Sequence, residues 1–366
     1  MTAMNRRQAL MSSASLTLGA QAAAQTSLPP AAAPAHLTAT ASASFATQPW
    51  GASGAFDAGP YRVERVVFPS GGVDVVGNLF VPAATPPRGA VALIGPVAFV
   101  KEQAPLQYAS RLAREGYAAL IFDPRFHGES GGVPRRYESR RAKVEDLRAA
   151  VGFLASRPDV DARRIHLLGI CQGVNWALEA AADEARVRAV AAVAGHYLMP
   201  ETAMLYLGTA QKVDERIAHA RRAREAFDRG EAPEYIPIVS LTDPDALLTA
   251  RPIHDFYYRW ADRGPFAAHT GLWENRITRM SEAEIWSHRI DEVLKRLERP
   301  MLMVHSDRAA SGPQIPRRLF DVAGARDKQA VWLDGRNQIQ FYQDPMTIDM
   351  VVPHLLAFFD RHGTRG

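Results

Sequence analysis

An apolar run ends in a glycine-flanked cysteine at Ile165-His166-Leu167-Leu168-Gly169-Ile170-Cys171-Gln172-Gly173. Residues 165–170 predict a buried strand, and residues 173–182 predict a helix. The turn between them is G-x-C-x-G, the spacing of a nucleophile elbow with cysteine in place of serine. Such a turn is tight and strained, so it requires small flanking residues. It lifts Cys171 onto the helix N-terminus, where the dipole lowers the thiol pKa and the Gln172 N–H faces a developing oxyanion. The alternative for Cys171 is an inert thiol in an alanine-rich core.

Strands and helices alternate on both sides of this turn. The predicted strands cover residues 62–68, 73–81, 90–94, 117–122, 165–170, 187–194, 301–305 and 330–333. This order predicts an α/β fold with a mostly parallel eight-stranded sheet and helices on both faces. The alternation stops between 197 and 298, where polar helical patterns predict a helical cap. The predicted core is therefore residues 58–196 and 299–366.

Length and composition narrow the class of protein further. The chain has 366 residues, of which 47% are hydrophobic and 22% charged, which excludes a disordered or collagenous protein. Its 43 basic and 39 acidic residues leave a net charge of only +4, so no nucleic-acid partner is implied. Cys171 is the single cysteine, so no intramolecular disulfide can form.

The first residues are typical of an export address. Arg6 and Arg7, within Asn5-Arg6-Arg7-Gln8-Ala9-Leu10, resemble a twin-arginine signal, and Ala22-Ala23-Ala24 provides a cleavage site. We expect residues 1–24 to be a signal peptide and residues 25–57, rich in Ala and Pro, to be a flexible tether. The apolar part is too weak for a membrane anchor, so the predicted location is the bacterial periplasm or the medium. The alternative is a disordered N-terminus with a chance arginine pair.

Four motifs together identify a resemblance. They are Lys101-Glu102-Gln103, the run Phe122-Asp123-Pro124-Arg125-Phe126-His127-Gly128-Glu129-Ser130-Gly131-Gly132, Val144-Glu145-Asp146, and the elbow. Over residues 60–362 the chain resembles the α/β-hydrolase superfamily, in the dienelactone-hydrolase-like branch with a cysteine nucleophile. The resemblance implies that Cys171 is the nucleophile and that Glu102 helps to activate it. It also implies an oxyanion hole made by the N–H of Gln172 and an N–H near Val97 or Ala98. His127 would be a structural loop residue.

The resemblance fails at the rest of the triad. The family's acid would fall on Ala309, and Asp307 stands two positions earlier, either as the acid or as a surface residue. The expected histidine falls on Gln338, whose amide has no useful basicity but can orient a water or a carbonyl. His196, after the strand over 187–194, is the best replacement base, and its alternative is a residue without a chemical role.

Aromatic residues of the cap are candidates for a substrate pocket. They are Phe256, Tyr257, Tyr258, Trp260 and Trp273. Side chains of this kind would form the wall of an apolar pocket above the elbow, the alternative being packing between cap and sheet. No metal-ligand spacing and no phosphate-binding loop is present in the sequence, so we expect neither a metal nor a cofactor.

Two functions follow from these patterns. The first is an exported hydrolase that acts on a small ester, thioester or lactone through a Cys171 acyl-enzyme. The second is a protein of the same fold without ordinary hydrolysis, which uses the pocket for acyl transfer, elimination, cyclisation or the binding of a small apolar ligand. The departures at Ala309 and Gln338 motivate the second, because hydrolysis of an acyl-enzyme needs a base to activate water.

Overall fold

The computed structural model describes residues 55–57, 59–84, 86–260 and 273–363. Nine of its strands form one sheet in the order β1-β2-β3-β5-β4-β6-β7-β10-β11. The pairs from β5 to β11 are parallel, whereas β1, β2 and β3 are antiparallel additions at one edge. The bounds are β1 Ala55–Asp57, β2 Tyr61–Ser70, β3 Val73–Pro82, β4 Gly89–Ile94, β5 Tyr117–Phe122, β6 Ile165–Ile170, β7 Val187–Val193, β10 Met301–His305 and β11 Lys328–Trp332.

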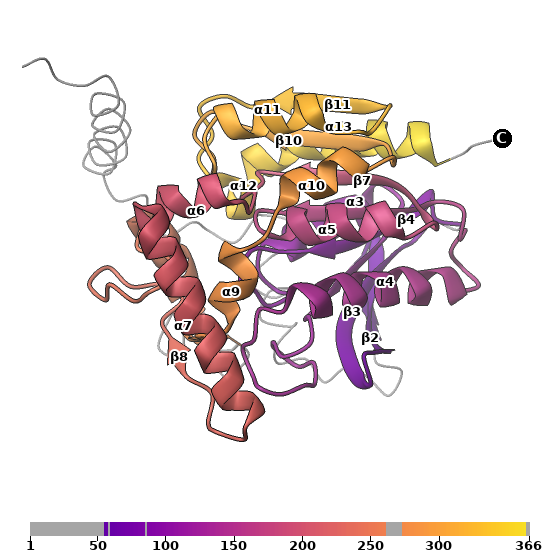
Figure 1. The fold of residues 1–366 in the computed structure, drawn as a ribbon. Helices are drawn as coiled ribbons and strands as arrows, with labels where there is room; N and C mark the ends of the chain where they lie inside the picture. The colour runs from indigo at the N-terminus through magenta and orange to yellow at the C-terminus, as the bar shows by residue number, and fades with distance from the viewer. Residues whose placement is uncertain (1–54, 58, 85, 261–272, 364–366) are drawn as a thin grey trace, which may run out of the picture.

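Helices cover both faces of the sheet (Figure 1). One face carries α3 (Ala104–Arg114), α12 (Gln340–Gln343) and α13 (Pro345–His362). The other carries α4 (Arg140–Ser156), α5 (Gly173–Asp183), α10 (Ile290–Arg296) and α11 (Gln314–Val322). Every residue of β4, β5 and β6 is buried, as expected for parallel strands covered on both faces. The predicted α/β-hydrolase fold is confirmed, and the short edge strand β1 adds a ninth strand to the expected eight.

The cap lies between β7 and β10, on one side of the molecule (Figure 1). It contains α6 (Pro200–Leu207), α7 (Ala210–Asp228), α8 (Arg251–Tyr258) and α9 (Ser281–Trp286). Two short strands, β8 (Tyr235–Ile236) and β9 (Ile277–Thr278), pair antiparallel within it. The expected cap range of 197–298 also includes α10, which packs against α5 and α11. We therefore describe α10 as the crossover helix that leads into β10.

The predicted signal peptide (1–24) lies outside the described residues. Only the end of the predicted tether (25–57) is described, and there β1 pairs with β2 through Ala55 and Glu64. Residues 55–57 therefore belong to the sheet, and the rest of the predicted tether lies outside the described residues. Among the described residues, no helix combines the length and the apolar character that a membrane crossing requires.

Candidate active site

The elbow at Cys171 is a strained turn between β6 and α5. Cys171 has a φ of 56°, a left-handed conformation that L residues rarely adopt. A Cβ atom at Gly169 would lie 2.6 Å from the Cα atom of Val174, and one at Gly173 would lie 2.5 Å from the carbonyl oxygen of Gly95. Both contacts are with backbone that cannot move aside. The G-x-C-x-G spacing is therefore required by the packing of the turn.

The ends of neighbouring strands hold the elbow in place. The N–H of Cys171 donates to the carbonyl of Val193 at 3.0 Å, and the N–H of His196 donates to the carbonyl of Cys171 at 3.1 Å. Ala194, between them after β7, also has a positive φ of 46°. The strained residues thus gather at the carboxyl ends of the parallel strands, where α/β proteins place their sites.

Four groups able to donate hydrogen bonds lie near the sulfur of Cys171 and favour its thiolate. They are the hydroxyl of Tyr342, the side-chain amide of Gln338 and the backbone N–H groups of Gln172 and His196. None of the four is a base. Cys171 is only 6% exposed, and this burial raises its thiol pKa to about 11 despite the donors. The prediction that the helix dipole lowers this pKa is therefore wrong, because desolvation outweighs it.

The amide of Gln338 has one orientation, because two of its partners are backbone groups of fixed polarity. Its Oε1 accepts from the N–H of Ala310 at 2.8 Å, and its Nε2 donates to the carbonyl of Ala194 at 2.9 Å. The second hydrogen of Nε2 points to the hydroxyl oxygen of Tyr342, also at 2.9 Å. Both hydrogens of Gln338 Nε2 are therefore bound to oxygen atoms, and the side chain offers donors, not a base, beside Cys171.

The loop after β4 forms the opposite wall. The N–H of Ala98 donates to the carboxylate of Glu138, which also binds Lys143 at 2.7 Å, so it is not available to an oxyanion. Ala98 is a correction to the predicted oxyanion hole. The hydroxyl of Tyr257 donates to the carbonyl of Val97 at 2.7 Å. Among the described residues no partner is found for the N–H of Val97, which remains the candidate alongside that of Gln172.

The cap aromatics divide into two groups. Trp273 donates from Nε1 to the carbonyl of Ala98 at 2.9 Å and stacks on Tyr257, with ring centroids 5.5 Å apart. Phe256 packs edge-on against Tyr342 at 5.1 Å. These three rings contact the loop after β4 and Tyr342 from the cap side, and they share the hydrophobic core cluster with Trp260. Tyr258 is 51% exposed and stacks on His254 with ring centroids 5.4 Å apart, so these contacts do not place it beside the elbow.

Glu102 does not act on Cys171. Its Oε1 pairs with Lys101 Nζ at 2.9 Å, and Lys101 also pairs with Asp123 at 2.8 Å. Burial raises the pKa of Glu102, against the opposing pull of Lys101. The carboxylate serves a buried ion cluster in the loop after β4, so the predicted activation of the thiol by Glu102 is not supported by its contacts.

His196 and Asp307 also lie differently from the prediction. The ring of His196 packs on Tyr206 at 4.8 Å, and its Nε2 is buried without a partner among the described residues. Burial lowers the pKa of this imidazole to about 4, which makes it a weak base. The carboxylate of Asp307 is exposed and accepts from the N–H of Gly335 at 2.7 Å. It joins two loops and does not contact Gln338.

Sequence reasoning missed two residues of the site, Tyr342 and Glu138. Tyr342 follows Gln338 by four positions and enters the site through the short helix α12. A signal for it existed, since an aromatic pair follows the expected histidine position in the family run. Glu138 lies in the loop before α4, and no sequence pattern connects it with Ala98.

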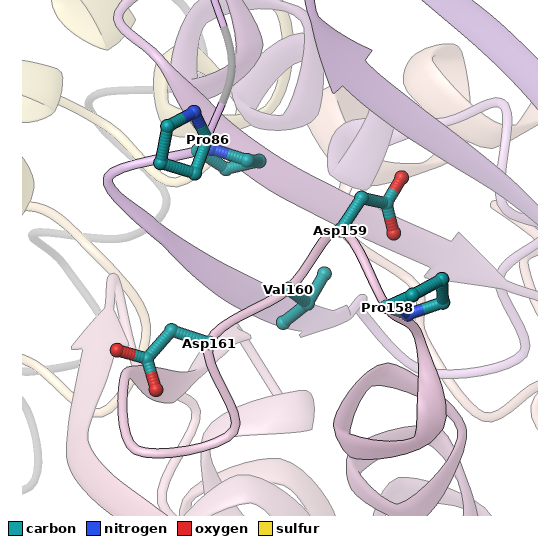
Figure 2. Close-up of a pocket in the computed structure, with 6 residues that line it drawn as sticks. Pro86, Pro158, Asp159, Val160 and Asp161 are labelled. Atoms are coloured by element: carbon teal, nitrogen blue, oxygen red, sulfur yellow. The ribbon is translucent and has the colours of Figure 1, made fainter.

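A separate pocket lies at the other end of the sheet (Figure 2). Its volume is about 450 Å³, and it is lined by Pro86, Pro87, Pro158, Asp159, Val160 and Asp161. These residues precede β4 and β6, at the amino ends of the parallel strands. The pocket is therefore remote from the elbow, which lies after the carboxyl end of β6.

Comparison with known proteins supports the same fold. The uncharacterized protein PA2218 of Pseudomonas aeruginosa is 28% identical over 80% of this chain and 78% of its own length. Its crystal structure superposes with a TM-score of 0.70 at 27% identity, over 86% of this chain and 98% of that one. The polyketide transferase claH of Penicillium crustosum is 30% identical over 64% of this chain and 75% of its own. A thiohydrolase of Eupenicillium brefeldianum is 29% identical over 72% of this chain and 79% of its own length.

A family model described as serine aminopeptidase, S33 (Hydrolase_4), matches residues 103–336. This range runs from the loop after β4 to the loop after β11 and includes the elbow. Because the match covers well over half of the chain and the fold agrees, the protein belongs to the Hydrolase_4 family of the α/β-hydrolase superfamily.

Proposed function

We propose that this protein accepts an acyl group from a small thioester, ester or lactone onto Cys171 and passes it to an acceptor other than water. One observation carries the proposal: groups able to donate hydrogen bonds lie near the sulfur, and the position expected for the base holds Gln338. The elbow favours the first half of the reaction. The missing base disfavours hydrolysis of the product.

Formation of the acyl-enzyme needs a nucleophile and an oxyanion hole. Cys171 stands at the N-terminus of α5, and the N–H of Gln172 lies beside its sulfur. The N–H of Val97 is the second candidate donor, and its loop is held by the hydrogen bonds of Tyr257 and Trp273 to the carbonyls of Val97 and Ala98. Two N–H groups of this kind stabilise the negative charge that develops on a carbonyl oxygen during acyl transfer.

Hydrolysis of that intermediate requires activation of a water molecule. A general base typically contributes about 10²–10⁴ to such a step. Gln338 has no basic atom to offer, because its oxygen is bound to the N–H of Ala310. His196 has a pKa lowered to about 4 by burial, and its Nε2 contacts neither Cys171 nor Gln338. We therefore expect water to hydrolyse the acyl-enzyme slowly.

The surroundings of the site favour an uncharged, apolar acyl group. Tyr257 and Phe256 of the cap and Tyr342 of α12 lie beside it, and a charged substrate would lose its hydration there without a compensating partner. A polyketide transferase and a thiohydrolase are among the relatives. These names support both group transfer and attack on a sulfur-linked substrate.

Hydrolysis is the second candidate, favoured by the thiohydrolase relative and by the family model. Product analysis separates the two. The protein is incubated with a butanoyl thioester and an excess of a second thiol, and butanoate and the new thioester are quantified. We expect the new thioester to dominate and Cys171→Ala to form neither product while it keeps its fold. Butanoate as the main product would contradict the transfer proposal.

We also propose that the protein is exported, on the basis of Arg6, Arg7 and the alanines at 22–24. Fractionation of cells that express the full chain tests this. The wild type should reach the periplasm or the medium with residues 1–24 removed, and a variant with Arg6→Lys and Arg7→Lys should stay inside. Equal distribution of the two would contradict the proposal.

A further inference from the structure

Tyr342 and Gln338 form a relay of hydrogen bonds that ends at the sulfur of Cys171. Both hydrogens of Gln338 Nε2 are assigned, one to the carbonyl of Ala194 and one to the hydroxyl oxygen of Tyr342 at 2.9 Å. The hydroxyl of Tyr342 therefore accepts at its oxygen and keeps its own proton free to donate. A phenol oxygen has a second lone pair, so it can also accept a hydrogen bond from a thiol, and it can take up that proton only as it gives up its own.

The phenol of Tyr342 is held against the sulfur. It hydrogen-bonds Cys171, and its ring is fixed by the edge-on contact with Phe256 at 5.1 Å. Tyr342 is only 3% exposed, so bulk water does not compete for its hydroxyl. This gives the site one group that can donate to the sulfur and accept from it.

We propose that Tyr342 is the proton relay of the acylation step, a role that rests on the acyl-enzyme proposed above. In one concerted step, the sulfur of Cys171 bonds to the carbonyl carbon as the bond from that carbon to the leaving sulfur breaks. The thiol proton passes to the oxygen of Tyr342 while the original phenol proton passes to the leaving sulfur, so the phenol never carries two protons. The products are acyl-Cys171 and a free thiol. No oxidant, metal or further proton is needed, and Tyr342 ends neutral.

The environment of the sulfur explains why a relay is needed. With the pKa of Cys171 raised to about 11 by burial, the thiolate is only about 10⁻⁴ of the protein at pH 7. An enzyme that waited for this fraction would react slowly at neutral pH. A relay lets the protonated thiol react, because deprotonation and attack occur together.

The groups that face the sulfur do not titrate near neutral pH. Burial raises the pKa values of Tyr342 from α12, Tyr257 from α8 and Tyr206 from α6, and lowers that of His196 after β7 to about 4. Glu138, which accepts from the N–H of Ala98, is paired with the buried Lys143. The three tyrosines and His196 therefore keep one charge state between pH 6 and 9. A dependence of the acylation rate on pH in that range is therefore assigned to the thiol of Cys171.

The pH profile of acylation tests the relay. The rate of acylation by S-butanoyl-N-acetylcysteamine is followed by intact mass from pH 6 to 9. We expect a flat profile for the wild type. For Tyr342→Phe we expect a rate at pH 7 that is lower by about 10²–10⁴ and that rises about tenfold per pH unit, since only the thiolate then reacts. Tyr197→Phe is the control, because this buried hydroxyl has no partner among the described residues. It should match the wild type.

A wild-type rate that rises about tenfold per pH unit overturns the relay, and so does a Tyr342→Phe profile that is as flat as the wild type. The wild-type profile is decisive even if Tyr342→Phe does not fold. Absence of any wild-type adduct across the range contradicts the proposed acyl-enzyme itself, and the relay with it. Failure of the relay alone leaves an adduct that forms with the wrong pH dependence.

Discussion

Gln338 reverses the polarity of the position that a triad histidine would occupy. In a triad the acid accepts a hydrogen bond from the histidine, which leaves the other ring nitrogen free to take a proton. Here the facing group is the N–H of Ala310, a donor, so the side chain at 338 must accept there and donate elsewhere. Two positions account for this reversal: Gln338 replaces the expected histidine, and Ala309, next to Ala310, replaces the expected acid.

Restoring hydrolysis therefore requires two substitutions. In Gln338→His the ring Nδ1 would accept from Ala310, and the protonated Nε2 would face Cys171 as a donor. We expect this variant to hydrolyse the butanoyl thioester no faster than the wild type. Addition of Ala309→Asp supplies an acceptor for Nδ1–H, and the double variant should hydrolyse about 10²–10⁴ faster. An equal gain from Gln338→His alone, measured as butanoate release, would show that the polarity argument is wrong.

For single residues, the sequence predicted the elbow but not the groups that contact it. Local sequence is enough to identify the strand over residues 165–170, the position of Cys171 and the absence of a histidine at Gln338. It could not show that the N–H of Ala98 is occupied, because the acceptor, Glu138, lies 40 residues away in the chain. The raised thiol pKa was missed for the same reason: burial is a property of the assembled cap and core.

The elbow as an element depends on close backbone approach between β4, β6 and α5. Gly173, the first residue of α5, fits only because it has no Cβ atom near the carbonyl of Gly95. The strand ends predicted from the sequence for β6 and β10 agree with the structure to the residue, whereas the eight-strand prediction missed β1. Three-residue edge strands carry no periodic pattern to detect.

Gly173→Ala should separate β4 from α5 locally. The added Cβ would lie 2.5 Å from the Gly95 oxygen, so we expect a loss of about 1–3 kcal/mol in the free energy of unfolding. Gly152→Ala in α4 is the matched control, because its Cβ meets only the flexible end of Arg186 at 3.3 Å. That control should gain about 0.5–1 kcal/mol from helix propensity. Urea titration measures both, and equal stability of the two variants would contradict this account of the turn.

Several histidines are buried in the core of the molecule, and burial favours their neutral form in the folded state. His166 packs on Phe359, with ring centroids 4.5 Å apart, and burial lowers its pKa to about 3. His288, against Trp176, has its pKa lowered to about 3 in the same way. Below the ordinary value of about 6.5 the unfolded chain binds protons that the folded protein does not. Stability should therefore fall as the pH drops from about 6.5 toward 3.

His166→Phe tests this dependence at the level of the whole fold. The aromatic ring preserves the stack, and the titratable group is removed. Between pH 6 and 4 the variant should lose up to about 1.4 kcal/mol less per pH unit than the wild type in the free energy of unfolding. Urea unfolding at several pH values gives both slopes. Identical slopes would show that His166 does not resist protonation in the folded state.

The central claim is that Cys171 carries an acyl group and water does not remove it. The most direct test is the intact mass of the wild-type protein over time, after one equivalent of butanoyl thioester is added without another acceptor. Cys171 is the single thiol, so a mass increase is readily assigned. We predict that the butanoyl adduct forms and then persists for many times its formation time. An adduct that decays as butanoate appears, or no adduct in the folded protein, would contradict the account.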